Sequence, residues 1–382
     1  MHEHKQNQCK RKVKHRKNVM RLIIFCITVG IAFMFIYYQN LRKEVYARQK
    51  WLETVLTGEK KWILENQGPE GEIYMNGSKA GDVNPYFACI AAQGLLAETK
   101  NCPMTETEKK AVGRYLDWHT GILLETDGKM GIYRKESGKL TYKEKADSED
   151  GYLGMYLFLM GKYLEKTEST DLPEYWKKGI SLALKKIQSL MQDGITQVSE
   201  ENTTAYLMDN LEVWKGLYEL EHAGLKDTQA ISEMREKIQA QIEKTFWDDT
   251  NQRWRIIGNS DLYHQAEFYP DGVAQIYPLI YEFPVKEKKK QKILYDQFTE
   301  KFQWQKLNKK RTGFLWAMTG MAAAQMGDIN NLVELIGNYE AEYCENRKYP
   351  LYTGEAGWIC MECGKLYGLY ERKIKTGFIL CA

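Results

Sequence analysis

Carboxylic acids and aromatic residues occur together at several places in this 382-residue sequence, each time at or just before the expected start of a helix. Carboxylates bond to sugar hydroxyls and can transfer protons, while aromatic faces pack against pyranose rings. These residues would form a carbohydrate site if the fold gathered the helix starts at one end. The candidates are Glu70, Asp82, Tyr86, Asp147, Asp150, Tyr206, Asp209, Tyr269, Asp271, Glu355 and Trp358.

A purely structural role is the alternative for each acid, because Asp and Glu are favoured at helix starts as caps and as partners of the positive dipole end. Asp147 and Asp150 have the spacing of such a capping start. Asp209 and Asn210 are expected a turn or more inside an apolar helix, where no cap is needed. A buried carboxylate there must be paired or face a polar cavity, so Asp209 favours a site.

Helical periodicity runs through nearly all of the chain from Val45 onward, with only eight prolines in the sequence. Links after the even-numbered helices are short, and links after the odd-numbered helices are mostly long. Two long links, residues 128–144 and 246–258, could hold β-hairpins because aromatic or branched residues flank a turn. The expected helices span residues 45–66, 84–99, 104–124, 147–166, 171–192, 203–223, 227–246, 267–282, 285–302, 311–326, 328–345 and 353–371.

The even-numbered helices are the more apolar set, as in residues 152–165 and 314–326. All-round apolarity with small residues indicates an inner ring shielded by the more charged odd-numbered helices. We therefore expect an all-α fold, an (α/α)6 toroid of six helical hairpins, with the long links gathered at one end. A solenoid of helix pairs is the alternative, but the segments lack its fixed repeat period.

The net charge of +3 combines two different regions. Residues 1–21 hold eight Lys and Arg against one acid, which makes +7 and leaves −4 for the rest of the chain. A body without excess positive charge argues against nucleic acid as a partner.

Residues 22–38 form a run without charge that can be extended to Leu41, about the 20 residues that cross a bilayer. A cleaved signal peptide is the rival interpretation, but the run is long and lacks a small-x-small cleavage site. A buried core helix does not explain the basic flank. The sequence thus predicts a basic cytoplasmic tail (1–21), a transmembrane anchor (22–41) and an extracellular domain (45–382) of a single-pass cell-membrane protein.

The segments that carry the candidate residues resemble the six-hairpin glycosidase-like superfamily over roughly residues 50–372. They are QGPEGEIY, VNPYFACIAAQGLL, ADSEDGYLGMYLFLM, YLMDNLEVWKGL, FYPDGVAQIYP and YTGEAGWICM. The resemblance implies an (α/α)6 barrel, with glycoside hydrolase family 8, an inverting family, as the nearest mechanistic relative. The Ser-Glu-Gly acid motif of that family is absent, and PEGEIY is only loosely similar to it.

On this resemblance we expect a glycoside hydrolase acting on a polysaccharide or oligosaccharide, with Glu70 as the general acid. Asp150 would be the base or would position the sugar ring, and inversion would place the two carboxyls about 6.5–9.5 Å apart. The remaining candidates would bind substrate, with Asp147, Asp209 and Asp271 contacting hydroxyls.

Two other functions stay open. One is a non-catalytic carbohydrate-binding or assembly protein that serves polysaccharide synthesis or export machinery. The other is a terpenoid-cyclase-like toroid, which the acidic run at residues 147–150 faintly suggests, although its Q-x-x-x-G-x-W repeats are absent.

No cofactor or metal is expected, because His119, His222 and His264 are widely spaced and form no two-histidine helix pair. Cys360 and Cys363 have the spacing of half a zinc or redox site, but a second such pair is missing from the sequence. We interpret these two cysteines as buried on one helix turn.

Overall fold

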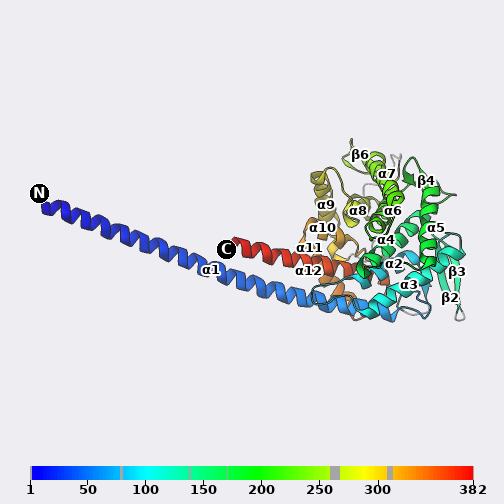
Figure 1. The fold of residues 1–382 in the computed structure, drawn as a ribbon, viewed down its shortest axis with the longest axis horizontal. Helices are drawn as coiled ribbons and strands as arrows, with labels where there is room; N and C mark the ends of the chain where they lie inside the picture. The colour runs from blue at the N-terminus through cyan, green and yellow to red at the C-terminus, as the bar shows by residue number, and fades with distance from the viewer. Residues whose placement is uncertain are drawn as a thin grey trace. The chain divides into compact units, whose positions relative to one another are not determined.

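The computed structural model describes residues 2–77, 81–136, 139–169, 171–258, 267–307 and 313–381. The chain divides into two compact units, one of residues 52–366 and one of residues 1–51 with 367–382. We call the first unit the body. The helices are α1 (His2–Glu65), α2 (Pro85–Leu96), α3 (Glu106–Glu125), α4 (Glu149–Thr167), α5 (Glu174–Leu190), α6 (Leu207–Glu221), α7 (Gln229–Phe246), α8 (Val273–Ile280), α9 (Lys288–Phe302), α10 (Thr319–Met326), α11 (Ile329–Tyr339) and α12 (Thr353–Cys381) (Figure 1).

Short strands occupy the long links between helices. β1 (Asp82–Val83), β2 (Gly131–Glu136) and β3 (Lys139–Lys145) form an antiparallel sheet in that order. β4 (Met191–Gln192) pairs with β5 (Ile195–Thr196), and β6 (Trp247–Asp248) pairs with β7 (Arg253–Trp254). Both hairpins expected from the sequence are therefore confirmed. Single helical turns complete the body at Phe268–Gly272, Trp304–Lys306 and Glu340–Cys344.

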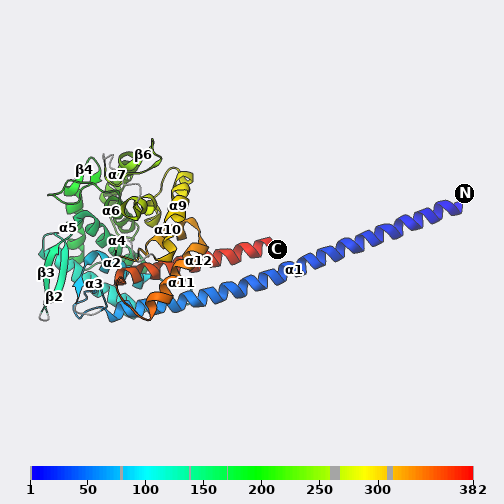
Figure 2. The same ribbon diagram turned by 180° about the vertical axis from the view of Figure 1, so that it is seen from behind.

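The even-numbered helices form a closed inner ring. Contacts join α2 to α4, α4 to α6, α6 to α8 and α8 to α10. α12 closes the ring, because a β-carbon on Gly94 of α2 would lie 2.6 Å from the Cα of Gly357, and one on Gly320 of α10 would lie 2.5 Å from the Glu362 carboxyl carbon. The fold is the expected (α/α)6 toroid of helical hairpins, whose helices Figure 2 shows from behind.

Burial separates the inner from the outer helices. On inner helix α4, every residue from Asp150 to Gly161 is buried. On outer helix α5, burial follows one face, with Trp176, Ile180, Ala183 and Ile187 inside. The inner helices approach each other closely because glycines face each other, as where a β-carbon on Gly216 would lie 2.2 Å from the carbonyl oxygen of Gly154. The all-round apolarity of the even-numbered helices thus reflects their position.

α1 is the helix of the described residues that is long and apolar enough to cross a membrane. Its large apolar side chains from Leu22 to Tyr37 are mostly exposed, with Phe33 at 69%. The sequence predicts an anchor that ends at Leu41 and a separate first body helix that starts at Val45. Residues 42–44 are helical as well, so both segments belong to the single helix α1.

Candidate active site

A cavity of about 840 Å³ opens at the end of the ring where the inner helices begin. Its walls come from the links into α2 and α4, the first turns of α6 and α12, and the segments before α8 and α10. The residues around it are Met75, Asn76, Asp82, Asn84, Tyr86, Phe87, Ile90, Ile132, Glu144, Lys145, Asp147, Ser148, Tyr152, Met208, Asp209, Glu212, Tyr269, Tyr277, Phe314, Trp316, Met318, Tyr352, Glu355 and Trp358. Among the sequence candidates, Asp82, Tyr86, Asp147, Asp209, Tyr269, Glu355 and Trp358 meet here.

Glu212 of α6 is the most enclosed acid of this cavity, with 2% of its surface exposed. Its Oε1 accepts hydrogen bonds of 2.5 Å from the hydroxyl groups of Tyr86 and Tyr277 and a longer one of 3.4 Å from Tyr281. Burial raises the pKa of Glu212 to about 7, although the hydrogen bonds from Tyr277 and Tyr86 act in the opposite direction. Glu212 is not among the site residues predicted from the sequence.

Asp209 lies three residues before Glu212, so both carboxyls are on one face of α6. Burial raises the pKa of Asp209 well above its ordinary value, and the neighbouring carboxyls of Asp150 and Glu212 raise it further. A β-carbon on Gly151 would lie 2.7 Å from Oε2 of Glu212 and 3.6 Å from Oδ1 of Asp209. Both oxygens therefore border one point of α4.

Positive charge is sparse around these acids. Lys145 is the only Lys or Arg among the described residues that line the cavity, and it pairs with Glu149 at 3.3 Å and Glu201 at 3.0 Å. Asp82 is neutralised at the rim, where Arg134 and Lys143 bind it at 2.5 and 2.8 Å. The hydrogen bond from Arg134 is the main cause of the lowered pKa of Asp82.

Asp150 is not among the residues that line the cavity, so its predicted role as a base or as a residue that positions the sugar ring gains no support from its place in the fold. The side chain is fully buried, and its oxygens accept hydrogen bonds from Ser148 Oγ at 2.8 Å, Thr196 Oγ1 at 2.7 Å and the Gly151 backbone N–H at 3.0 Å. Burial raises the pKa of Asp150 to about 6. The capping start expected from Asp147 and Asp150 is shifted by one residue, because the N-cap of α4 is Ser148, whose Oγ accepts from the Gly151 N–H.

Glu70 does not line the cavity either, so its predicted role as the acid gains no support from its place in the fold. It is exposed, and its backbone N–H donates to Oε2 of Glu72 at 3.0 Å. Glu72 is buried and also accepts a hydrogen bond of 2.8 Å from the Tyr74 hydroxyl group. The inward carboxylate of this loop thus belongs to Glu72 and serves the loop itself.

Two further candidates, Tyr206 and Asp271, do not line the cavity. Tyr206 is the extended residue before α6 and pairs with Ile257 in an isolated β-bridge. Asp271 is buried in the turn before α8 and borders a separate hollow of about 290 Å³. The sequence placed both at helix starts correctly, but side-chain direction cannot be inferred from position along the chain alone.

An aromatic wall forms part of the cavity. Phe87 stacks on Phe314 with ring centroids 5.6 Å apart, and Tyr269 lies 4.6 Å from Trp316. Trp316 has a left-handed backbone, with φ of 59°, which is unfavourable for a bulky residue. Oε1 of Glu355 accepts from the backbone N–H groups of Leu315 and Trp316 at 3.2 and 3.1 Å, and Oε2 accepts from Ala317 at 2.8 Å. Glu355 therefore holds the segment that presents Trp316.

Trp358 lines the cavity. It also lines a second hollow of about 240 Å³ nearer the other end of the ring.

His119, His222, Cys360 and Cys363 do not line the cavity. His119 is buried beside Tyr115 and Cys89, burial lowers the pKa of His119 to about 3, and His222 follows the C-terminus of α6. His264 lies outside the described residues. Cys360 and Cys363 are buried, as expected. No group of three His, Cys, Asp or Glu that could hold a metal ion occurs in the described part of the chain.

Solved structures confirm the fold class. A glycosidase variant is similar over 86% of this chain and 98% of its own, with 12% identity and a TM-score of 0.60. D-mannose isomerase is similar over 83% and 97%, with 11% identity and a TM-score of 0.55. An inactive variant of the α-1,6-mannanase GH76A of Salegentibacter sp. HEL1_6, in complex with α-1,6-mannotriose, is similar over 83% and 99%, with 10% identity and a TM-score of 0.52.

No protein-family model matches the sequence, and no curated protein does either. The chain thus has a toroid fold that glycosidases use and that also occurs in an isomerase. Because fold alone does not fix activity, the function has to be argued from the cavity.

Proposed function

We propose that the protein is a glycoside hydrolase that cleaves a polysaccharide or oligosaccharide in the cavity of its body. The observation that carries the proposal is the pair of carboxyls on α6, Asp209 and Glu212, which line the cavity together. Hydrolysis of a glycosidic bond needs two such groups, one to protonate the leaving oxygen and one to act at the anomeric carbon or on water.

The two carboxyls differ in their partners, which supports different roles. Tyr86 and Tyr277 donate hydrogen bonds to Glu212, and such donors stabilise the ionised form. Asp209 has carboxyl neighbours that disfavour its ionised form. We assign the proton to Asp209 as general acid and the negative charge to Glu212, since two close carboxyls resist being charged together.

The spacing of the pair favours retention of configuration. Both oxygens border the same point on Gly151 of α4, so they lie closer together than the roughly 6.5–9.5 Å of an inverting pair. Glu212 would attack the anomeric carbon while Asp209 protonates the departing oxygen. Asp209 would then take a proton from water, which attacks the same carbon and releases Glu212. This assignment replaces the inverting mechanism expected from family 8.

The test is hydrolysis by the full chain in detergent, offered bacterial envelope polysaccharides, α-mannan and β-glucans. Released reducing ends report cleavage, and proton NMR of the first product reports its anomeric configuration. Retention of configuration supports the Asp209–Glu212 pair, whereas inversion overturns it. Binding of a glycan without release of product would support the alternative, a carbohydrate-binding or assembly protein of a polysaccharide synthesis or export system.

We further propose that residues 22–41 anchor the protein in the cell membrane, with the basic residues 1–21 in the cytoplasm and residues 45–382 outside. The exposure of apolar side chains along this part of α1 supports the proposal, and the basic flank supports the orientation. Protease added to intact cells should remove the body and spare the N-terminal tail. Recovery of a body that lacks residues 1–41 would instead indicate a cleaved signal sequence.

A further inference from the structure

An aromatic row leads from the cavity to the protein surface. Phe87 and Phe314 stack inside, and the ring centroid of Phe314 lies 5.5 Å from that of Tyr352. Tyr349 follows at 6.1 Å from Tyr352 and has 70% of its surface exposed. A single exposed tyrosine needs no special explanation, but Tyr349 continues a row that begins at the cavity wall.

The backbone around this row is firmly held. Thr353 donates its N–H to the Met75 carbonyl oxygen and its hydroxyl to the Tyr74 carbonyl oxygen, both at 2.8 Å. A β-carbon on Gly313 would lie 2.7 Å from the Tyr349 hydroxyl oxygen, so this phenol lies directly against the segment that carries Phe314. The exposed ring thus has a fixed support on one side and solvent on the other.

The row also lies apart from the acid pair in the chain. Asp209 and Glu212 come from α6, whereas Phe314, Tyr349 and Tyr352 come from the segments that precede α10 and α12. In space the row begins beside Tyr86, which donates to Glu212 and whose ring centroid lies 5.4 Å from that of Phe87. Phe314, Tyr352 and the exposed Tyr349 continue the row toward solvent. A sugar held at the carboxyls would therefore leave Tyr349 for another unit of the same chain. Aromatic faces bind pyranose rings by apolar contact with their C–H surfaces, and they suit neutral units better than charged ones.

We propose that Tyr352 of the cavity wall and the exposed Tyr349 beyond it form an additional sugar subsite, which makes the protein a binder of glycan chains longer than a disaccharide. This inference rests on the proposed carbohydrate function and adds the class of substrate: an extended chain with uncharged units beyond the cleavage point.

The experiment measures binding to the full-length Glu212→Gln protein in detergent, so that hydrolysis does not interfere. The probes are fragments of two and six sugars from α-mannan, β-glucan and chitin. We expect a six-sugar fragment to bind about tenfold more tightly than the two-sugar fragment of the same glycan. Tyr349→Ala should weaken six-sugar binding about five- to tenfold and leave two-sugar binding unchanged, whereas Tyr349→Trp should retain the affinity.

Tyr175→Ala on outer helix α5 is the matched control, since Tyr175 is 40% exposed and does not line the cavity. Equal affinity for both fragment lengths, or no effect of Tyr349→Ala on the longer one, overturns the subsite while leaving the hydrolase proposal intact. If none of the fragments binds and none is cleaved by the parent protein, the proposed function fails and the subsite with it.

Discussion

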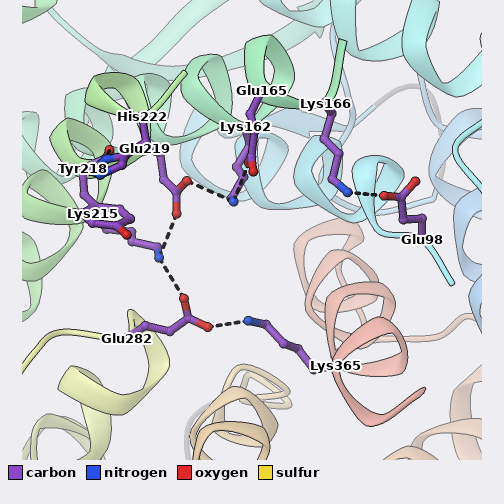
Figure 3. A network of polar contacts seen from close by, with 10 residues as sticks. All are labelled: Glu98, Lys162, Glu165, Lys166, Lys215, Tyr218, Glu219, His222, Glu282 and Lys365. Atoms are coloured by element: carbon purple, nitrogen blue, oxygen red, sulfur yellow. Dashed lines mark hydrogen bonds and ion pairs between the residues drawn. The ribbon is translucent and has the colours of Figure 1, made fainter. Parts of the chain in front are cut away.

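Both ends of the inner ring carry acids, but the acids at the two ends have different neighbours. At the end with short links, carboxylates alternate with ammonium groups (Figure 3). Lys215 binds Glu219 at 2.8 Å and Glu282 at 3.2 Å, and Lys162 binds Glu219 at 3.0 Å. Lys365 completes the group by pairing with Glu282.

At the cavity end, the neighbouring carboxyl groups of Asp209 and Glu212 would repel each other if both were ionised. Lys145 is the only Lys or Arg that lines the cavity among the described residues, and it pairs with Glu149 and Glu201 instead. The short-link end joins α4, α6, α12 and the segment after α8 by opposite charges and so contributes to stability. The cavity end leaves its buried carboxyls to compete for protons, which opposes folding when they ionise. Such an arrangement is typical of a reactive site.

Removing the carboxylate at the cavity end should have the largest effect. We expect Glu212→Gln to lower kcat on a cleaved glycan roughly 10³-fold or more, because the group would act on the reacting carbon. Gln keeps the size and an oxygen for the tyrosine hydroxyl groups, so the melting temperature at neutral pH checks that the fold is intact. Activity near that of the parent protein would remove Glu212 from catalysis. Parallel assay of Glu70→Gln tests the assignment made from sequence.

The pH dependence of activity should reflect the scarcity of Lys and Arg side chains around Asp209 and Glu212 among the described residues. Since burial raises the pKa of Glu212 to about 7, kcat/KM should rise as the pH increases through about 7, then fall when Asp209 loses its proton. The apparent pKa values belong to the pair rather than to either group. An acid limb near pH 4.5, the ordinary range for glutamate, would contradict this environment. Initial rates between pH 4 and 10 measure the profile.

The cavity carboxyl should also make the fold sensitive to high pH. A folded-state pKa of about 7 for Glu212, above the ordinary 4.5, means that its contribution to stability is fully present below pH 4.5 and is lost as the pH rises through about 7. We expect Glu212→Gln to melt several degrees above the parent protein at pH 8.5 and at about the same temperature at pH 5. A pH-independent difference in calorimetry would refute this linkage.

The opposite sign and the smallest effect are expected at the short-link end. Burial works against ionisation of Glu282, but Lys215 and Lys365 outweigh it and lower the pKa of Glu282 to about 2. Its stabilising contribution is therefore present above pH 4.5 and is lost as the pH falls through about 2.

We expect Glu282→Gln to lower the melting temperature by a few degrees at pH 7, with a difference that narrows below pH 4.5. Thermal unfolding between pH 7 and 3.5 measures it. Glu165→Gln is the matched control, because its partner Lys162 retains Glu219. A loss of stability that does not change with pH would attribute the effect to packing instead of charge.

The helical part of the fold was predictable because periodicity and link length are local features. The segment before α10 was not. Apolar residues from Phe314 to Met318 continue the helical pattern, yet α10 begins only at Thr319. The backbone N–H groups of Leu315, Trp316 and Ala317 bind Glu355, a partner about 40 residues away that periodicity cannot reveal.

The site was less predictable for a similar reason. The sequence predicts Asp209 a turn or more inside a helix, but α6 starts at Leu207, so Asp209 lies in its first turn. It reaches the cavity nonetheless. Glu212 gave no signal by itself, although its i+3 spacing from Asp209 put both on one face. Glu70 and Glu72 were indistinguishable in sequence, since only the hydrogen bonds of the folded loop decide which of them turns inward.

The position of Trp358 bears on how much space the inner ring offers to a ligand. The same indole borders both the cavity and the hollow of about 240 Å³ beyond it. At that point the two spaces are therefore separated by a single side chain. We expect the size of this side chain to limit how far a bound molecule can extend between the inner helices. Replacing Trp358 by a smaller residue should connect the cavity with the hollow beside the ion pairs at the opposite end of the ring. The volume open to a ligand would then increase while the carboxyl groups of the site stay the same.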